Sequence, residues 1–142
     1  MRILVALVSM LALSGGALAQ TGDTPAPTRL DLALSALDPV DKGCRMSFLV
    51  KNDMASEIEE LSLEIAVFGA SGGLDRMLRL NFGLLIEGKT RVRQFDLAGT
   101  ACEGVGSVLL NDVATCDGGG LTPVTCLRAV SVRADGPVPF GL

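Results

Sequence analysis

Four cysteines carry the most informative chemistry in this sequence of 142 residues: Cys44, Cys102, Cys116 and Cys126. A thiol–disulfide oxidoreductase would need a Cys-x-x-Cys pair, and a four-thiolate metal site would need two close pairs of cysteines. Neither spacing is present. An even number of cysteines in a chain bound for an oxidising compartment predicts two structural disulfide bonds instead.

The absence of His, Trp and Tyr narrows the chemistry further. Without His there is no Ser-His-Asp or Cys-His catalytic system and no His-ligated zinc. Without Trp and Tyr, and with a net charge of −4, the chain is not expected to stack bases or to neutralise phosphates. We predict no enzyme activity, no cofactor, no metal site and no nucleic-acid partner.

The sixteen carboxylates leave one enzyme class open. Glu57, Glu59 and Glu60 lie in a polar segment, where a solvated acidic run is the ordinary interpretation. Glu64 and Asp96 lie on predicted strands and would approach each other across a sheet, as an acid–base pair requires. A hydrolase that uses only carboxylates is therefore an alternative to a non-catalytic protein.

Four arginines lie on two successive predicted strands: Arg76 and Arg79 on the first, and Arg91 and Arg93 on the second. Together they would form a basic stripe on an otherwise acidic molecule. The ordinary expectation is a solvated sheet face on which these side chains pair with carboxylates. The alternative is a binding site for an anionic partner.

The N-terminus has the layout of a secretory signal peptide. Met1-Arg2 is positive, residues 3–13 are apolar apart from one serine, and Ala17-Leu18-Ala19 has the small-x-small pattern of a cleavage site. Cleavage after Ala19 leaves 142 minus 19, or 123, residues with a net charge of −5. The alternative is an uncleaved anchor, but only 17 residues, two of them glycines, are available to span a membrane. We predict a periplasmic or secreted protein with no membrane span after cleavage.

The rest of the chain is predicted to form one domain of short strands. Residues 20–28 hold two prolines and are predicted to be a flexible lead-in, residues 29–135 a β-sandwich, and residues 136–142 a tail. Apolar residues recur at period two between turn signals, which is typical of half-buried strands. The expected strands are 30–37, 46–51, 61–67, 74–80, 90–97, 105–110 and 127–133.

Two segments allow more than one interpretation. The alternation slips between Val92 and Phe95, which predicts either a bulge or a strand covered on both faces. Residues 56–62 have the Ser-x-x-Glu spacing of a capping box and would otherwise form a helical turn. Seven short strands with almost no helical pattern predict an all-β fold, an antiparallel β-sandwich.

This topology favours one of the three possible disulfide pairings. If the strand that begins near Cys44 runs antiparallel beside residues 91–97, Cys44 lies near Cys102. The glycine-rich loop 117–120 allows Cys116 to reach Cys126. The favoured pairs are therefore Cys44–Cys102 and Cys116–Cys126.

Three short motifs carry a resemblance to a known family: Lys42-Gly43-Cys44-Arg45, Arg91–Leu97 and Leu110-Asn111-Asp112. They resemble an uncharacterised family of small exported proteins from alphaproteobacteria, commonly labelled Tat pathway signal sequence domain proteins. The pattern of residues 46–97 also looks like the immunoglobulin-like modules of exported bacterial proteins, of the FxLYD type. The resemblance covers nearly the whole processed chain and implies no activity and no functional residue. The twin arginine of that export route is absent, because Arg2 stands alone.

These observations predict a non-catalytic binding or accessory module of the periplasm. Its partner would be a protein or another component of the cell envelope. The alternative is a structural or assembly component of an envelope complex, which would pair through an exposed edge strand or an apolar patch.

Overall fold

The computed structural model describes residues 28–142. The predicted signal peptide (1–19) and all but the last residue of the predicted lead-in (20–28) lie outside the described residues. Within residues 28–142, no helix has both the length and the apolar character needed to cross a membrane.

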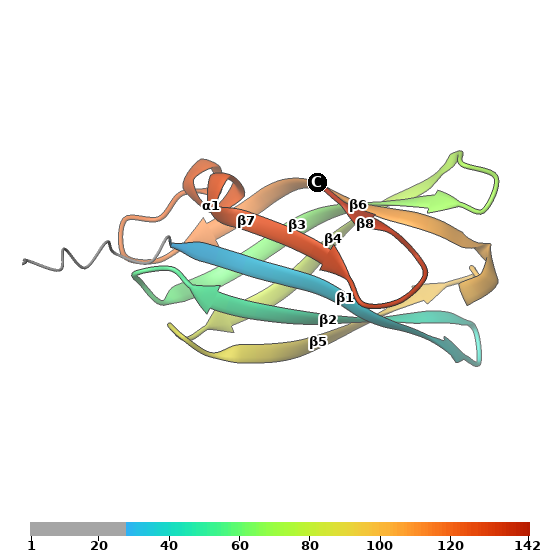
Figure 1. Ribbon diagram of the computed structural model, residues 1–142, viewed down its shortest axis with the longest axis horizontal. Helices are drawn as coiled ribbons and strands as arrows, with labels where there is room; N and C mark the ends of the chain where they lie inside the picture. The colour runs from blue at the N-terminus through green and yellow to red at the C-terminus, as the bar shows by residue number, and fades with distance from the viewer. Residues whose placement is uncertain (1–27) are drawn as a thin grey trace, which may run out of the picture.

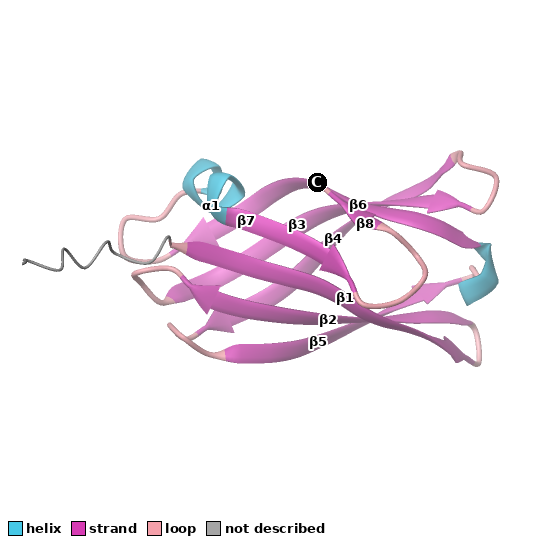
Figure 2. Cartoon of the chain, viewed as in Figure 1, coloured by secondary structure: helices cyan, strands magenta, loops and turns pink. Residues whose placement is uncertain are grey.

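Eight strands form two four-stranded sheets that pack face to face (Figure 1). The first sheet has the order β5 (Thr90–Ala98), β2 (Gly43–Asp53), β1 (Arg29–Val40) and β7 (Val130–Ala134). The second sheet has the order β4 (Leu74–Leu85), β3 (Ile58–Gly69), β6 (Val105–Asp117) and β8 (Phe140–Gly141). Two short helices, η1 (Cys102–Gly104) and α1 (Pro123–Ala129), lie at opposite ends of the sandwich (Figure 2). The predicted all-β sandwich is confirmed.

Neighbouring strands are antiparallel except for one parallel pair in each sheet. These two pairs are β1 with β7 and β6 with β8. The chain crosses from one sheet to the other after β2, β4, β5, β6 and β7, and this Greek-key path brings the last strands alongside earlier ones. The seven predicted strands correspond to β1–β7, and β8 is an eighth.

The core follows from the alternation of residue types. On β3, the four apolar residues Leu61, Leu63, Ile65 and Val67 are buried at every second position and face the other sheet. Burying each such side chain contributes about 1.5–3 kcal/mol. The largest group in the core is aromatic: Phe48 lies 5.7 Å from Phe82, measured between ring centroids.

The predicted strand at 127–133 is wrong in its first half. Residues 123–129 form α1, and β7 begins only at Val130. Thr122 caps this helix, because its side chain accepts a hydrogen bond from the backbone N–H of Thr125, and Pro123 occupies the first turn. These local start signals override the apolar alternation that predicted a strand.

The predicted tail at 136–142 is also wrong, because these residues complete the sandwich. The carbonyl oxygen of Pro139 accepts a hydrogen bond of 2.9 Å from the backbone N–H of Val108. Phe140 is only 7% exposed and packs 5.7 Å from Phe48 between ring centroids. A proline excludes a segment from a central strand but not from a short edge strand such as β8.

Both segments with open interpretations are now assigned. The helical turn considered for residues 56–62 is replaced by β3, which begins at Ile58. The bulge considered for residues 90–97 is absent, because β5 pairs with β2 without a register shift from Thr90 to Ala98. A register shift lies instead in β1, between Leu34 and Ala36.

Candidate functional site

The two disulfides have the favoured pairing, Cys44–Cys102 and Cys116–Cys126, with Cα–Cα distances of 4.9 Å and 6.5 Å. The first joins the start of β2 to η1, and the second joins the end of β6 to α1. They therefore fix opposite ends of the sandwich. No cysteine of the described chain remains free, and two disulfides indicate an oxidising compartment.

The end held by Cys44–Cys102 is tightly built. A Cβ atom at Gly43 would collide with the carbonyl oxygen of Leu97 on the neighbouring strand β5. Only glycine allows the two backbones to approach so closely at this position. The disulfide then holds η1 against the β1–β2 hairpin, so that η1 has a fixed position beside β1.

An apolar groove of about 610 Å³ lies beside this disulfide, between β1, η1 and the loop that joins β7 to β8. Figure 1 shows that loop, in red, arching between β1 and β6. Few polar atoms line the groove, as is typical of binding sites for apolar groups. Its lining residues are Leu34, Ala36, Leu37, Pro39, Cys102, Glu103, Val105, Gly136, Pro137 and Val138.

One wall of the groove is a strand edge without a partner. β7 pairs with β1 only from Leu30 to Leu34, and the last bond on this side runs from the backbone N–H of Asp135 to the carbonyl oxygen of Leu34. From Ala36 to Val40, β1 pairs with β2 on its other side only, within the described residues. The register shift between Leu34 and Ala36 marks the point where the pairing with β7 ends.

The groove has one ionisable lining residue, Glu103. Its side chain is exposed and makes no ion pair within residues 28–142. The site therefore combines apolar walls, backbone hydrogen-bonding groups and a single negative charge. The groove therefore has one carboxyl group among its lining residues, whereas acid–base catalysis by a carboxylate pair needs two.

The four arginines considered as a basic stripe make two kinds of contact. Arg79 pairs with Glu64 at 3.0 Å, as expected for a solvated sheet face. The other three donate hydrogen bonds to the backbone across the open side where β4 and β5 face each other. Within residues 28–142, β4 and β5 are the end strands of their sheets on this side. These bonds are Arg91 Nη1 to Leu84 O at 2.6 Å, Arg93 Nε to Phe82 O at 2.7 Å and Arg76 Nη1 to Ala98 O at 2.8 Å.

We call this arrangement the arginine closure, formed by Arg76, Arg91 and Arg93. It explains the slip in the alternation of β5. The more buried side of β5 carries Arg91, Arg93, Phe95 and Leu97, whereas the polar Gln94 is exposed. A long arginine stem covers apolar surface while the guanidinium reaches a carbonyl group at the rim, so that a charged residue takes an inward position.

Glu64 and Asp96 do not form the acid–base pair that a hydrolase would need. They lie on different sheets, Glu64 on β3 and Asp96 on β5, and each pairs with its own arginine. Arg45 donates two hydrogen bonds to Asp96, at 2.6 Å and 2.9 Å. These bonds lower the pKa of Asp96, and the same contact raises the pKa of Arg45.

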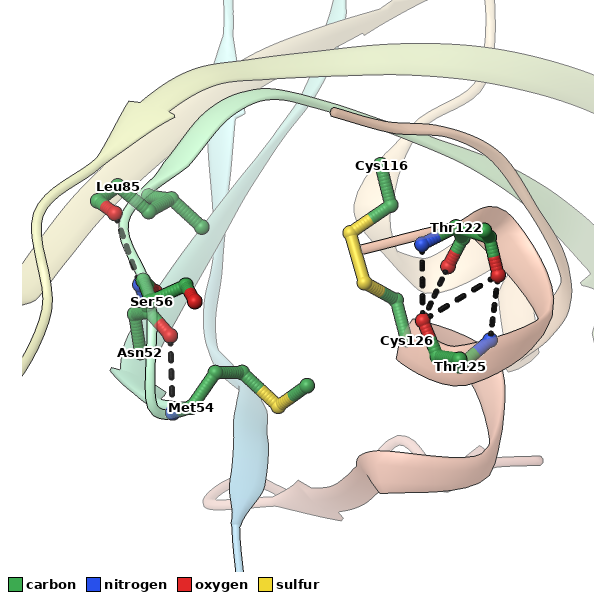
Figure 3. The surroundings of a disulfide bond; sticks show 8 residues. All are labelled: Asn52, Met54, Ser56, Leu85, Cys116, Thr122, Thr125 and Cys126. Carbon is green, nitrogen blue, oxygen red and sulfur yellow. Dashed lines mark hydrogen bonds between the residues drawn. A yellow bond between two sulfur atoms is a disulfide. The ribbon is translucent and has the colours of Figure 1, made fainter. Parts of the chain in front are cut away.

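The opposite end of the sandwich contains a buried polar residue that the sequence pattern did not single out. Asn52 is fully buried, and its side-chain amide donates to the carbonyl oxygens of Ser56 and Leu85 and accepts from the N–H of Met54 (Figure 3). Every polar group of this side chain has a partner, so it ties the β2–β3 connection to the end of β4. It is a structural residue, and no groove adjoins it among those described.

The described residues hold no cluster of three or more His, Cys, Asp or Glu side chains that would bind a metal ion. The resemblance to exported alphaproteobacterial proteins stays a prediction. Comparison with known protein families, with curated proteins and with solved structures finds no match for this chain.

Proposed function

We propose that the protein is a non-catalytic binding module of the periplasm or of the secreted fraction, and that the groove beside Cys44–Cys102 is its binding site. The observation that carries the proposal is the pairing of an apolar groove with an unpartnered strand edge on a scaffold fixed by a disulfide. The two disulfides and the predicted signal peptide support the location.

The distribution of carboxylates favours binding over hydrolysis. The groove has Glu103 as its single carboxylate, and the two other candidates, Glu64 and Asp96, are engaged with arginines on separate sheets. An acid–base mechanism needs two carboxyl groups on either side of one bond, and this groove offers one.

A structural component of an envelope complex is the second candidate. Leu74 and Met77 on β4 are 58% and 47% exposed, which favours an apolar contact on a face away from the groove. A permanent component would use such a face and would co-purify in a fixed ratio with its complex. A binding module would be isolated as a stable monomer.

The test is a pull-down with the tagged protein from the envelope fraction, in the original form and with Ala36→Trp. This substitution places a large side chain in the groove at a partly exposed strand position. We expect the amount of partner recovered with Ala36→Trp to fall at least tenfold. The matched control is Val92→Trp, which adds the same side chain at an exposed position of β5. Equal recovery with both variants would place the binding site elsewhere.

A further inference from the structure

We propose that the groove binds a short extended peptide segment of another protein, which adds to the first sheet as a strand beside Ala36–Asp38 and places a basic side chain against Glu103. This inference rests on the proposed function and names its ligand class. It follows from three features of the groove: its backbone wall, its apolar walls and its single charge.

The backbone wall comes first. β7 occupies the edge of β1 only as far as Leu34, and the groove begins where that pairing ends, with Leu34, Ala36 and Leu37 in its lining. An extended peptide placed here continues the line of β7 and pairs with the unpartnered backbone of β1. Main-chain hydrogen bonds supply affinity in this mode of recognition, and pockets for alternate side chains supply specificity.

The apolar walls decide which side chains face inward. Leu37 belongs to the first sheet, Val105 to the second, and Val138 to the loop that closes the groove. A strand between them turns every second side chain toward these walls. We therefore expect apolar residues at alternate positions of the peptide.

Pro39 limits the length of the added strand. A proline has no backbone N–H, so it cannot donate to a strand on either side. The ladder is therefore confined to the few residues that precede it. This favours a short peptide over the long, continuous pairing by which edge strands aggregate.

The charge of this chain favours a peptide from another protein, rather than from a second copy of this chain, as the occupant of the groove. The processed chain has a net charge of −5, and a symmetric contact through this edge would bring two unpaired Glu103 side chains to one interface. The other broad open side, at β4 and β5, is occupied by the arginine closure. A peptide with Lys or Arg beside its apolar residues complements Glu103.

The probe for this proposal is a phage-displayed library of random linear hexapeptides, selected on the purified, disulfide-bonded protein. We expect enrichment of sequences with apolar residues at alternate positions and at least one Lys or Arg. Selection on Glu103→Gln is expected to lose the preference for basic residues. Selection on the control Glu87→Gln, in the β4–β5 turn, is expected to keep it.

A second measurement tests strand addition itself. An enriched peptide should slow amide hydrogen exchange at Ala36–Asp38, and the same peptide methylated at alternate backbone nitrogens should bind at least tenfold more weakly. Enrichment of no sequence overturns the proposal. If binding survives backbone methylation, the peptide does not bind by strand addition. If binding is unchanged by Glu103→Gln, Glu103 does not select a basic side chain. In either case the proposal is overturned, while the groove remains a binding site. The proposed function itself fails only if Ala36→Trp retains its partner.

Discussion

The strand edges on the two open sides of this sandwich are covered to different extents. On one side, β4 and β5 face each other, and three arginines donate hydrogen bonds to backbone carbonyl groups across the gap. On the other side, β7 and β8 are short, and half of β1 has no strand partner on its outer edge among the described residues. On the first side, three backbone carbonyl groups accept hydrogen bonds from side chains, whereas the second side leaves backbone groups beside an apolar groove.

The difference teaches that an unpartnered edge on one side of a small sandwich is informative when the opposite side is protected. Edge strands invite pairing with other chains, and proteins commonly block them with inward-pointing charges or with short strands. Both devices are present here, and within the described residues neither of them reaches Ala36–Val40 of β1. This contrast is the main reason for assigning binding to the groove side.

The largest expected effect comes from Phe48, which joins both sides through one aromatic cluster. Its ring lies 5.7 Å from Phe82, 6.1 Å from Phe95 and 5.7 Å from Phe140, measured between centroids. Phe48→Ala should lower the free energy of unfolding by about 3–5 kcal/mol, measured by urea denaturation. Phe68→Ala, outside the cluster and partly exposed, should cost clearly less. Equal decreases in the free energy of unfolding for Phe48→Ala and Phe68→Ala would show that the β4–β5 side and the groove side do not share an aromatic core.

Because each disulfide fixes a different end of the molecule, removing them one at a time tests the two ends separately. Loop entropy gives upper figures of about 4 kcal/mol for Cys44–Cys102 and about 3 kcal/mol for Cys116–Cys126. Replacing both cysteines of a pair by serine should lower stability in that order, measured by thermal unfolding under non-reducing conditions. Only loss of Cys44–Cys102 should also weaken peptide binding, because η1 lines the groove. Equal loss of binding in both variants would contradict a groove held by one disulfide.

The arginine closure can be broken without removing the apolar stems. Arg91→Met with Arg93→Met deletes two charge-assisted hydrogen bonds to the backbone of β4 and should cost roughly 1–3 kcal/mol in total. The freed edge should also self-associate, so that the sedimentation coefficient rises with protein concentration. Arg79→Met, which removes only a surface ion pair, is the control and should change stability by less than about 0.5 kcal/mol. A double variant that stays monomeric would show that the closure does not protect the edge.

The smallest effect is expected from Asp96→Asn, because both partners of the Arg45–Asp96 pair are well exposed. Arg45 lowers the pKa of folded Asp96, so the unfolded chain binds the proton more readily. The stabilisation is therefore present above the ordinary range of an aspartate and is lost as the pH falls through the lowered pKa. The thermal midpoints of the two proteins should differ slightly at neutral pH and converge in acid. A difference that is constant with pH would assign the effect to something other than charge.

The strands and the disulfide pairing could be predicted because their signals are local. Leu61 to Val67 alternate as half-buried strands do, and the neighbourhood of Cys44 and Cys102 follows from one antiparallel pairing. The helix α1 has a readable start signal as well, in Thr122 followed by Pro123, but the apolar alternation of residues 127–133 competes with it.

The groove and the arginine closure could not be predicted from residue types. Arg91 and Arg93 take inward positions that periodicity assigns to apolar residues, and only the approach of β4 explains why they are satisfied there. Glu103 and Val138 lie 35 residues apart in sequence, and they line one groove because η1 and the β7–β8 loop converge on β1. Such convergence is a property of the packed chain.

The parallel pairing of β7 with β1 has a consequence for the order of folding. Asp31 faces Ser131, one hundred residues later, so this contact closes nearly the whole described chain. Closing so long a loop is entropically costly until the intervening strands have shortened it, and folds rich in distant pairings acquire their native contacts slowly. We therefore expect the β1–β2 hairpin to form before β7 docks. During that interval the entire outer edge of β1 is available to other chains, so an early-binding chaperone would meet the same strand that later borders the groove.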